Sequence, residues 1–474
     1  MTSFSTFAAN AAAVDSSAGE RALLHALRRT GFGISPEEWA LGRRMGVYGW
    51  LERQLDYESI DDSALEGWIA EHLPTVGMAT EDIDRAARDD RLTPQRVAAE
   101  LQMASIARAL FSPRRLYEMM VDFWTNHFNV AHQDINTRLL KTADDRDVIR
   151  ANAMGAFPAL LQASARSPAM LYYLDNYSNT ADGPNENYAR ELLELHTLGV
   201  DGGYTEQDVA EVARCLTGWS VSLRPVRGLF RFYPQLHDQG AKTVLGETIA
   251  AGGGMEDGQR VLDLLARHPS TANHIAAKLC RRFVADEPEP ALVERVALRF
   301  SDSAGDVRET LEELLFSDAF FASAGAKFKR PLELLGSAVA ALNIVPGEAG
   351  LGTLRASLNL LGQSPFGWAP PTGYPDRASN WVSSSALINR WNECLILGSG
   401  NKPDLPVDFA PVTAAAQSAE QLADAIVDTL LHASVAPADR RILVDFLTAG
   451  GERFRELAPA AAALVIASPY FQYR

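Results

Sequence analysis

The segment PNENYARELLELHTLGV brings acidic, basic and imidazole side chains together in one short, helix-like stretch. Glu186, Arg190 and Glu194 recur every fourth residue, a spacing that forms ion pairs along the surface of a helix. Glu191 and Glu194 are three residues apart, and two carboxylates so placed repel each other unless a cation or a proton lies between them. Such a pair can hold a metal ion or divide its pKa values for acid–base catalysis.

This segment has three interpretations: a functional carboxylate pair, a buried ion-pair network, or an exposed ladder of ion pairs. The spacing matches neither HExxH nor the Glu-x-x-His pair of di-iron helical bundles. On an ideal helix, His196 points away from Glu191 and Glu194, unless the helix ends before it. Arg190 would anchor an anionic substrate. The candidate catalytic residues of the segment are Glu186, Arg190, Glu191, Glu194 and His196.

Two further stretches, FWTNHF and LHDQG, place an imidazole beside a polar residue. His127 is either a core histidine with satisfied hydrogen bonds or a metal ligand or general base. Its neighbour Asn126 is a catalytic candidate. His237 and Asp238 offer either a ligand and an acid–base group, or an Asx-type turn.

The metal hypothesis joins four of these residues. If His127, Glu191, Glu194 and His237 converge in the fold, their nitrogen and oxygen atoms suit a divalent transition metal such as Zn, Fe or Mn. Five aromatic residues either wall a cleft for a sugar or polymer or pack in the core. They are Trp124, Trp219, Phe366, Trp368 and Trp381.

The elements that position these residues are predominantly helical. A Ser or Thr followed by Pro is a strong helix start, and it occurs at Ser35–Pro36, Thr93–Pro94 and Ser112–Pro113. Residues 221–250 alternate apolar residues with turn formers, which predicts a β-hairpin or irregular loop. Residues 362–381 are rich in Pro, Gly and Trp and predict a long structured loop, which is often functional.

We therefore predict an all-α protein: one large multi-helix body with a small β-hairpin or irregular excursion and the long Pro/Gly/Trp-rich loop. Residues 1–20 predict a flexible N-terminal arm, and residues 21–474 one helical domain with its core at 93–300. Residues 58–95 are polar and acidic and predict a mobile excursion.

Composition and motifs exclude several classes of protein. The net charge of −16, without a basic patch that interleaves aromatics, argues against a nucleic-acid partner. No stretch reaches the roughly 18 apolar residues of a membrane span. The three cysteines lie far apart and predict buried apolar residues rather than disulfides. Walker A, GxGxxG, GxSxG and CxxCH motifs are absent from the sequence, which argues against nucleotide-driven and α/β-hydrolase chemistry.

The extended segment PNENYARELLELHTLGVDGGYTEQDVAEVARCLTGW resembles the central signature of the bacterial "domain of unknown function 1800" family. Other matching stretches follow in family order, among them LLHALRRTGFG, FWTNHF, SPAMLYYLDN, LHDQGAKTVLG, LGQSPFGWAPPTGYPDRASNW and ASPYFQYR. The resemblance extends from about residue 20 to residue 474. One departure is Gly373–Tyr374, where the family usually has a Gly-Trp pair.

The resemblance implies a helical protein without an agreed activity. It also implies a partner, because genes of this family often lie beside genes for an exported family that resembles sulfatases and alkaline phosphatases. Members often carry export signals, whereas this N-terminus has no basic residue before Arg21 and no apolar segment typical of a signal peptide. We expect a protein that is either cytoplasmic or exported together with a partner.

Two functional hypotheses follow. The first is a metal-assisted hydrolase or oxidoreductase that uses the candidate residues named above. The alternative is a non-catalytic helical partner or scaffold of the sulfatase-like or phosphatase-like protein. We call the segment PNENYARELLELHTLGV, residues 184–200, the polar signature. A solvent-accessible pocket at the polar signature favours the enzyme, and an exposed apolar patch elsewhere favours the scaffold.

Overall fold

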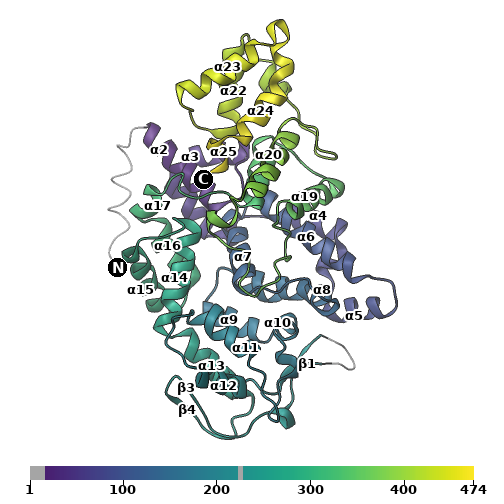
Figure 1. Ribbon diagram of the computed structural model, residues 1–474, viewed down its shortest axis with the longest axis vertical. Coiled ribbons are helices and arrows are strands. Elements are labelled where there is room, and N and C mark those ends of the chain that lie inside the picture. The colour runs from purple at the N-terminus through teal and green to yellow at the C-terminus, as the bar shows by residue number, and fades with distance from the viewer. Residues whose placement is uncertain (1–15, 223–227) are drawn as a thin grey trace.

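The computed structural model describes residues 16–222 and 228–474 and shows a body of helices with two small sheets (Figure 1), which confirms the all-α prediction. The N-terminal helices are α2 (Ser16–Thr30), α3 (Pro36–Leu55), α4 (Ser63–His72), α5 (Thr80–Arg88), α6 (Pro94–Phe111), α7 (Arg115–His127) and α8 (Ile135–Ala143). Helix α2 begins inside the predicted N-terminal arm, whose residues 1–15 lie outside the described part of the chain.

The predicted helix starts have a local cause that the structure shows. Ser35 and Glu38 form a reciprocal capping box at the start of α3. The Thr93 side chain accepts a hydrogen bond from the backbone N–H of Arg96 at the start of α6. At the third start, the Ser112 hydroxyl instead accepts from the backbone N–H of Arg114, so α7 begins three residues later than its Ser-Pro signal.

The middle of the chain contains shorter helices and the four strands of the described residues. The helices are α9 (Phe157–Ala165), α10 (Pro168–Tyr173), α11 (Asn187–Glu191), α12 (Glu206–Cys215), α13 (Met255–Ala266), α14 (Pro269–Phe283), α15 (Pro290–Asp302), α16 (Val307–Leu315) and α17 (Asp318–Ala322), with π-helical turns η4 (Asp144–Arg150) and η6 (Leu192–Thr197). Strands β1 (Trp219–Val221) and β2 (Phe230–Phe232) pair antiparallel, as do β3 (Lys242–Val244) and β4 (Glu247–Ile249). The predicted β excursion is therefore confirmed, although residues 223–227 lie outside the description.

The C-terminal helices run from green to yellow in Figure 1; the yellow ones form one end of the molecule, and the C-terminus lies beside α2 and α3. They are α18 (Pro331–Ala341), α19 (Glu348–Leu360), α20 (Ser384–Gly398), α21 (Ala410–Thr413), α22 (Ala419–Leu431), α23 (Pro437–Thr448), α24 (Ala458–Ala467) and α25 (Pro469–Gln472). Helix α20 packs on α24, and α24 packs on α22.

One continuous group of buried apolar side chains runs from Leu23 to Phe471 and therefore extends beyond the predicted core at 93–300. A smaller group centres on Ile83 and Val97. Three of its members, Ile83, Ala86 and Leu92, belong to the stretch 58–95 that the sequence predicts to be mobile. The structure shows α4 and α5 in this stretch, and their Ile69 and Ile83 are buried. Hydrophobic burial offsets the entropy of ordering these short helices.

The cysteine and aromatic predictions can be compared directly with burial. Cys215, Cys280 and Cys394 are buried free thiols, as expected. Four of the five singled-out aromatic residues are buried, which favours core packing for them, and the fifth, Trp368, is half-buried. Among the described residues, no helix combines the length and apolarity needed to cross a membrane.

Candidate functional site

The C-terminal end of α7 is held against the Pro/Gly/Trp-rich loop. The Asn126 side-chain oxygen accepts a hydrogen bond from the backbone N–H of Tyr374 at 3.0 Å. The Asn129 amide donates to the carbonyl oxygen of Trp368 at 2.9 Å. Between these contacts Gly373 has φ +68°, and a Cβ at this position would overlap the carbonyl oxygen of Asn126. Glycine is required here on both counts.

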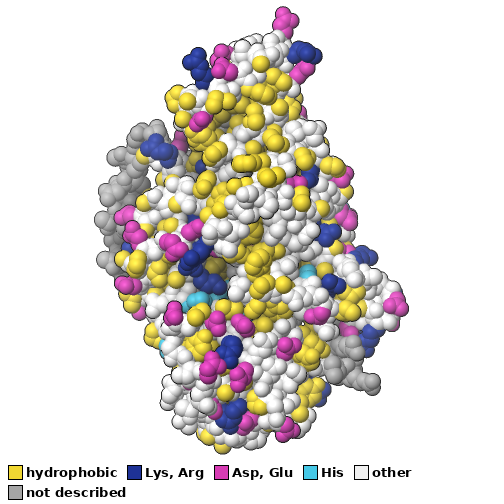
Figure 2. Space-filling view, in the orientation of Figure 1, with side chains coloured by type: hydrophobic (Ala, Val, Ile, Leu, Met, Phe, Trp, Pro, Cys, Tyr) yellow, Lys and Arg dark blue, Asp and Glu magenta, His cyan; other side chains and the backbone are white. Residues whose placement is uncertain are grey.

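A cavity of about 230 Å³ lies beside this contact, between α7, α14, the start of α18 and residues 372–377 of the loop. Its charged lining is mainly basic and consists of Lys278, Arg281, Arg282, Arg330 and Arg377 with Asp122 and Asp376. Asn126 and His127 also line it. Figure 2 shows basic side chains gathered beside a hollow near the middle of the molecule, with a histidine directly below them. In a protein of net charge −16, this concentration of cations creates a local site for anions.

Two of these arginines are neutralised by carboxylates, of which Glu333 is buried and Asp122 and Asp376 are half-buried. Arg282 donates to Glu333 at 2.6 Å and to Asp376 at 3.1 Å, and Arg330 donates to Asp122 at 2.5 Å. Burial alone would raise the pKa of Glu333, but the guanidinium groups of Arg474, Arg282 and Arg330 hold it well below its usual range. The ion pairs therefore fix the wall of the cavity through charge-assisted hydrogen bonds.

Lys278 forms no comparable ion pair among the described residues. Its Nζ lies 2.8 Å from Nδ1 of His127, whose Nε2 lies 3.0 Å from the carbonyl oxygen of His196. A carbonyl oxygen can only accept, so Nε2 carries the proton and Nδ1 accepts from Lys278. Burial and the neighbouring Arg281 lower the pKa of Lys278 to about 8, against the opposing effect of Asp376.

His127 is neutral in this arrangement. Burial, followed by the charge of Lys278, lowers its pKa well below the ordinary value of 6.5. His274 faces the same group, since its Nε2 lies 3.0 Å from the carbonyl oxygen of Leu195 and burial lowers its pKa to about 4. Two uncharged imidazoles therefore lie beside Lys278, whose amine can gain or lose a proton near neutral pH.

The polar signature supports these imidazoles with its backbone. After α11 the segment continues as the π-helix η6, and its carbonyl groups at Leu195 and His196 meet the two ring nitrogens. These are end-of-helix carbonyls that the helix itself leaves unpaired. The His196 ring is fully buried, and neither of its nitrogens has a hydrogen-bond partner in the described structure. Burial, with Lys278 and His274, lowers the pKa of His196 to about 3, so this candidate is also neutral.

The charged side chains of the signature lie elsewhere. Arg190 pairs with Glu206 at 2.8 Å and with Glu186 at 3.3 Å on the surface, which is the exposed ladder. Glu191 and Glu194 are half-buried. Burial and the charge of Glu194 raise the pKa of Glu191. None of these carboxylates lines the basic cavity.

The second predicted imidazole lies in a separate, closed network. His237 is buried, with Nδ1 at 2.8 Å from the carbonyl oxygen of Thr217 and Nε2 at 3.1 Å from Asp257. Lys242 donates to the same Asp257 carboxylate at 2.7 Å. Asp238 accepts from the backbone N–H of Gly240 at 2.8 Å, which is an Asx-type turn.

The four predicted metal ligands do not converge. Among the described residues, no group of three or more His, Cys, Asp or Glu side chains is arranged to hold a metal ion. The nitrogens of His127 and His237 are instead used in the hydrogen bonds given above. The hypothesis required Glu191 and Glu194 to meet His127 and His237 in three dimensions, but these two carboxylates are half-buried and do not line the cavity that His127 lines.

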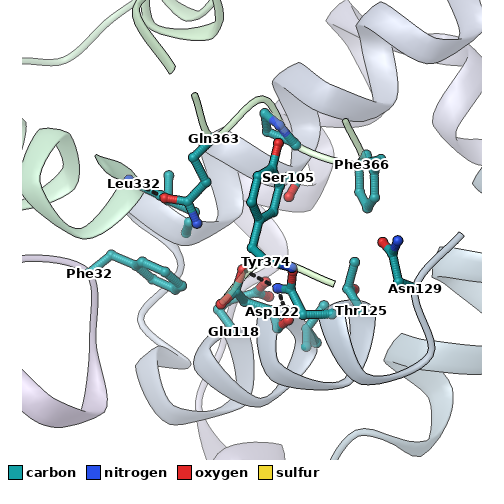
Figure 3. A pocket seen from close by; sticks show the side chains of 14 residues that line it. Phe32, Ser105, Glu118, Asp122, Thr125, Asn129, Leu332, Gln363, Phe366 and Tyr374 are labelled. Atoms are coloured by element: carbon teal, nitrogen blue, oxygen red, sulfur yellow. Dashed lines mark hydrogen bonds between the residues drawn. The ribbon is translucent and has the colours of Figure 1, made fainter. Parts of the chain in front are cut away.

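Tyr374 also lines a second, smaller cavity of about 40 Å³. Figure 3 shows the Tyr374 side chain in its middle, between Gln363 and Phe366. The Tyr374 hydroxyl donates to the carbonyl oxygen of Ser364 at 2.8 Å, so the ring is fixed. Asp122, Asn126 and Tyr374 line both cavities, so the two cavities share one wall.

Sequence reasoning missed the basic lining. Lys278, Arg281 and Arg282 belong to KLCRRF, Arg330 precedes the proline of a helix start, and Asp376 belongs to YPDR. A lysine and two arginines at i, i+3 and i+4 on one predicted helix are a usable signal for a basic face. The sequence does not show that they meet Asp122 and His127, because these come from a helix more than a hundred residues earlier.

Comparison with known proteins adds the family. The family described as "Protein of unknown function (DUF1800)" matches residues 25–473. Neither the curated proteins nor the solved structures contain a match to this chain. The match covers nearly the full chain and includes both the polar signature and every residue of the basic cavity, so the chain belongs to the family of unknown function DUF1800.

Proposed function

We propose that the cavity at Lys278 is a binding site for a small anionic substrate. The observation that carries this proposal is that Lys278 and Arg281 line the cavity without a salt bridge to any described carboxylate, their contacts being to the His127 ring and to the backbone carbonyl of Asp286. Both side chains are half-buried, and a cation partly removed from water without a counter-ion is costly unless an anionic ligand pairs with it. The volume of about 230 Å³ is below the roughly 300–1,000 Å³ typical of drug-sized ligand pockets, which suits a small metabolite rather than a polymer.

The same residues support an enzyme of acid–base type. Lys278, with a pKa lowered to about 8, can give or take a proton close to neutral pH. Asn126 and His127, both catalytic or ligand candidates from the sequence, lie in the cavity wall and orient the loop and the lysine. A hydrolase or an oxidoreductase of this type would use Lys278 rather than the four predicted metal ligands.

Anion titration tests the binding site. Inorganic phosphate, sulfate and citrate would be titrated into the wild type and into Lys278→Met and Arg281→Met, with isothermal calorimetry as the readout. The exposed Arg440, which pairs with Asp424 far along the chain, provides the matched control Arg440→Met. Loss of one charge-assisted hydrogen bond, about 1.5–3 kcal/mol, predicts a tenfold or greater loss of affinity in both pocket variants.

The control variant should bind like the wild type. If none of the anions binds, or if the pocket variants bind as well as Arg440→Met, the proposal fails. Circular dichroism of each variant separates a lost site from a lost fold.

A second candidate function, the non-catalytic partner, is favoured by a different surface. Ile388, Trp391 and Leu395 form a stripe along α20 and are 53 %, 47 % and 40 % exposed. Figure 2 shows yellow apolar side chains concentrated over the upper half of this face. An apolar stripe of this kind is typical of a protein contact surface. The partner that the family resemblance implies is the sulfatase-like or phosphatase-like protein.

Co-purification with that protein tests the second candidate. Ile388→Asp with Trp391→Asp should abolish a complex formed by the two purified proteins, whereas Lys278→Met should leave it intact. Absence of a complex with the unmodified chain would contradict the candidate.

A further inference from the structure

Lys278 differs from every other lysine of the chain in its surroundings. The sequence has six lysines. Four are paired with carboxylates: Lys141 with Asp144, Lys242 with Asp257, Lys327 with Asp286 and Lys402 with Glu393. The fifth, Lys329, lies 4.0 Å from the centre of the Phe471 ring. Lys278 has an imidazole partner instead and lines a cavity.

The imidazole partner leaves the amine available. His127 accepts one N–H of Lys278 through Nδ1, and no other hydrogen bond of this amine is present in the described structure. The groups that face it are the neutral rings of His127, His196 and His274, the cation Arg281 and the anion Asp376. Burial and a neighbouring cation both favour the neutral amine, which is the nucleophilic form.

We propose that Lys278 forms an imine with the carbonyl carbon of a small oxo-carboxylate whose carboxylate is held by Arg281. The inference rests on the proposed anion site and names its substrate class. The amine nitrogen bonds to the carbonyl carbon to give a carbinolamine. The carbon–oxygen bond then breaks, and the oxygen leaves as water with the two hydrogens that the amine gives up. The step consumes no oxidant or reductant.

The geometry separates the two tasks of such a site. The planar guanidinium of Arg281 suits a carboxylate, and its Nε already donates to the carbonyl oxygen of Asp286 at 3.2 Å, which fixes its direction. Arg281 follows Lys278 by three residues on α14, so both side chains lie on the same face of that helix. A carbonyl next to a carboxylate can therefore reach the amine while the carboxylate stays on the guanidinium.

Reductive trapping tests the inference. The full-length protein would be incubated with pyruvate and sodium borohydride, and the adduct located by intact-mass and peptide mass spectrometry. We expect one adduct on Lys278 in the wild type and in the control Lys402→Arg, which keeps its ion pair with Glu393. Lys278→Arg should give no adduct. Acetone, which has the carbonyl but lacks the carboxylate, should be trapped at least about tenfold more slowly, and Arg281→Met should remove this preference.

The possible failures are distinguishable. An adduct spread over several lysines, or none at Lys278 while phosphate still binds, would overturn the imine but leave the anion site. Loss of both pyruvate trapping and binding of every anion would overturn the proposed function as well. If Lys278→Arg does not fold, the Arg281→Met preference and the peptide map of the wild type still decide the question.

Discussion

Lys278 and Arg282 lie one helical turn apart on α14 and carry the same charge, but their surroundings are opposite. Arg282 is bound by Glu333, Asp122 and Asp376. Among the described residues, the hydrogen-bond partner of Lys278 is the neutral His127. Compensated charges stabilise a fold through hydrogen-bonded networks, whereas an uncompensated charge costs stability and is retained where a ligand uses it. One helix therefore provides both the support of the cavity and its reactive group.

The largest change in the free energy of unfolding should come from removing a carboxylate that pairs with Arg282. Glu333→Gln leaves Arg282, Arg330 and Arg474 without their shared carboxylate, and loss of one partner of a buried ion pair typically costs about 3–5 kcal/mol. Urea denaturation measures the free energy of unfolding. Glu206→Gln, which removes an exposed partner of Arg190, is the control and should leave it unchanged. A Glu333→Gln protein as stable as the wild type would show that the network contributes nothing.

The same network predicts acid sensitivity. The depressed pKa values of Glu333 and Asp376 mean that the unfolded chain binds protons before the folded one does. Their stabilisation is therefore fully present above their ordinary values of 4.5 and 3.8 and is lost as the pH falls below them. Urea midpoints measured from pH 6 downward should fall more steeply in the wild type than in Glu333→Gln. Parallel curves for the two proteins would contradict this assignment.

Removing the charge of Lys278 should change the free energy of unfolding in the opposite direction. Lys278→Met removes a desolvated cation and should stabilise the fold by about 0.5–2 kcal/mol while it abolishes anion binding. The lowered pKa also gives a pH signature. Between about 8 and 10.5 the unfolded chain keeps the proton of Lys278 and the folded one does not, so wild-type stability rises over this interval relative to Lys278→Met. A destabilised variant would place Lys278 among the structural lysines.

The smallest change in the free energy of unfolding should come from a substitution in the polar signature. Glu191 is half-buried without an ion pair in the described structure, and its raised pKa shows that its charge is disfavoured. Glu191→Gln should therefore change the unfolding free energy by less than about 0.5 kcal/mol, on the stabilising side. A loss of several kcal/mol in urea denaturation would instead reveal a buried network.

Much of the fold was predictable because helix starts are local. The Ser-Pro and Thr-Pro signals at Ser35 and Thr93 act through hydrogen bonds to residues three positions away. The site was predictable only in part. His127 and Asn126 do line the cavity, but whether Lys278 has a carboxylate partner depends on segments that meet only in three dimensions. Charge spacing within the signature identified carboxylates and could not show that its backbone carbonyls, rather than its side chains, reach the site.

The contact of Gly373 and Tyr374 with Asn126 also affects the order in which the chain folds. This contact joins residues 248 positions apart. Closing so long a loop costs conformational entropy before the contact repays it, and proteins rich in such distant contacts fold slowly. During synthesis α7 leaves the ribosome long before the loop that covers it. We expect the binding cavity to be among the last parts of the molecule to form, so that a bound anion would report completed folding rather than guide its early steps.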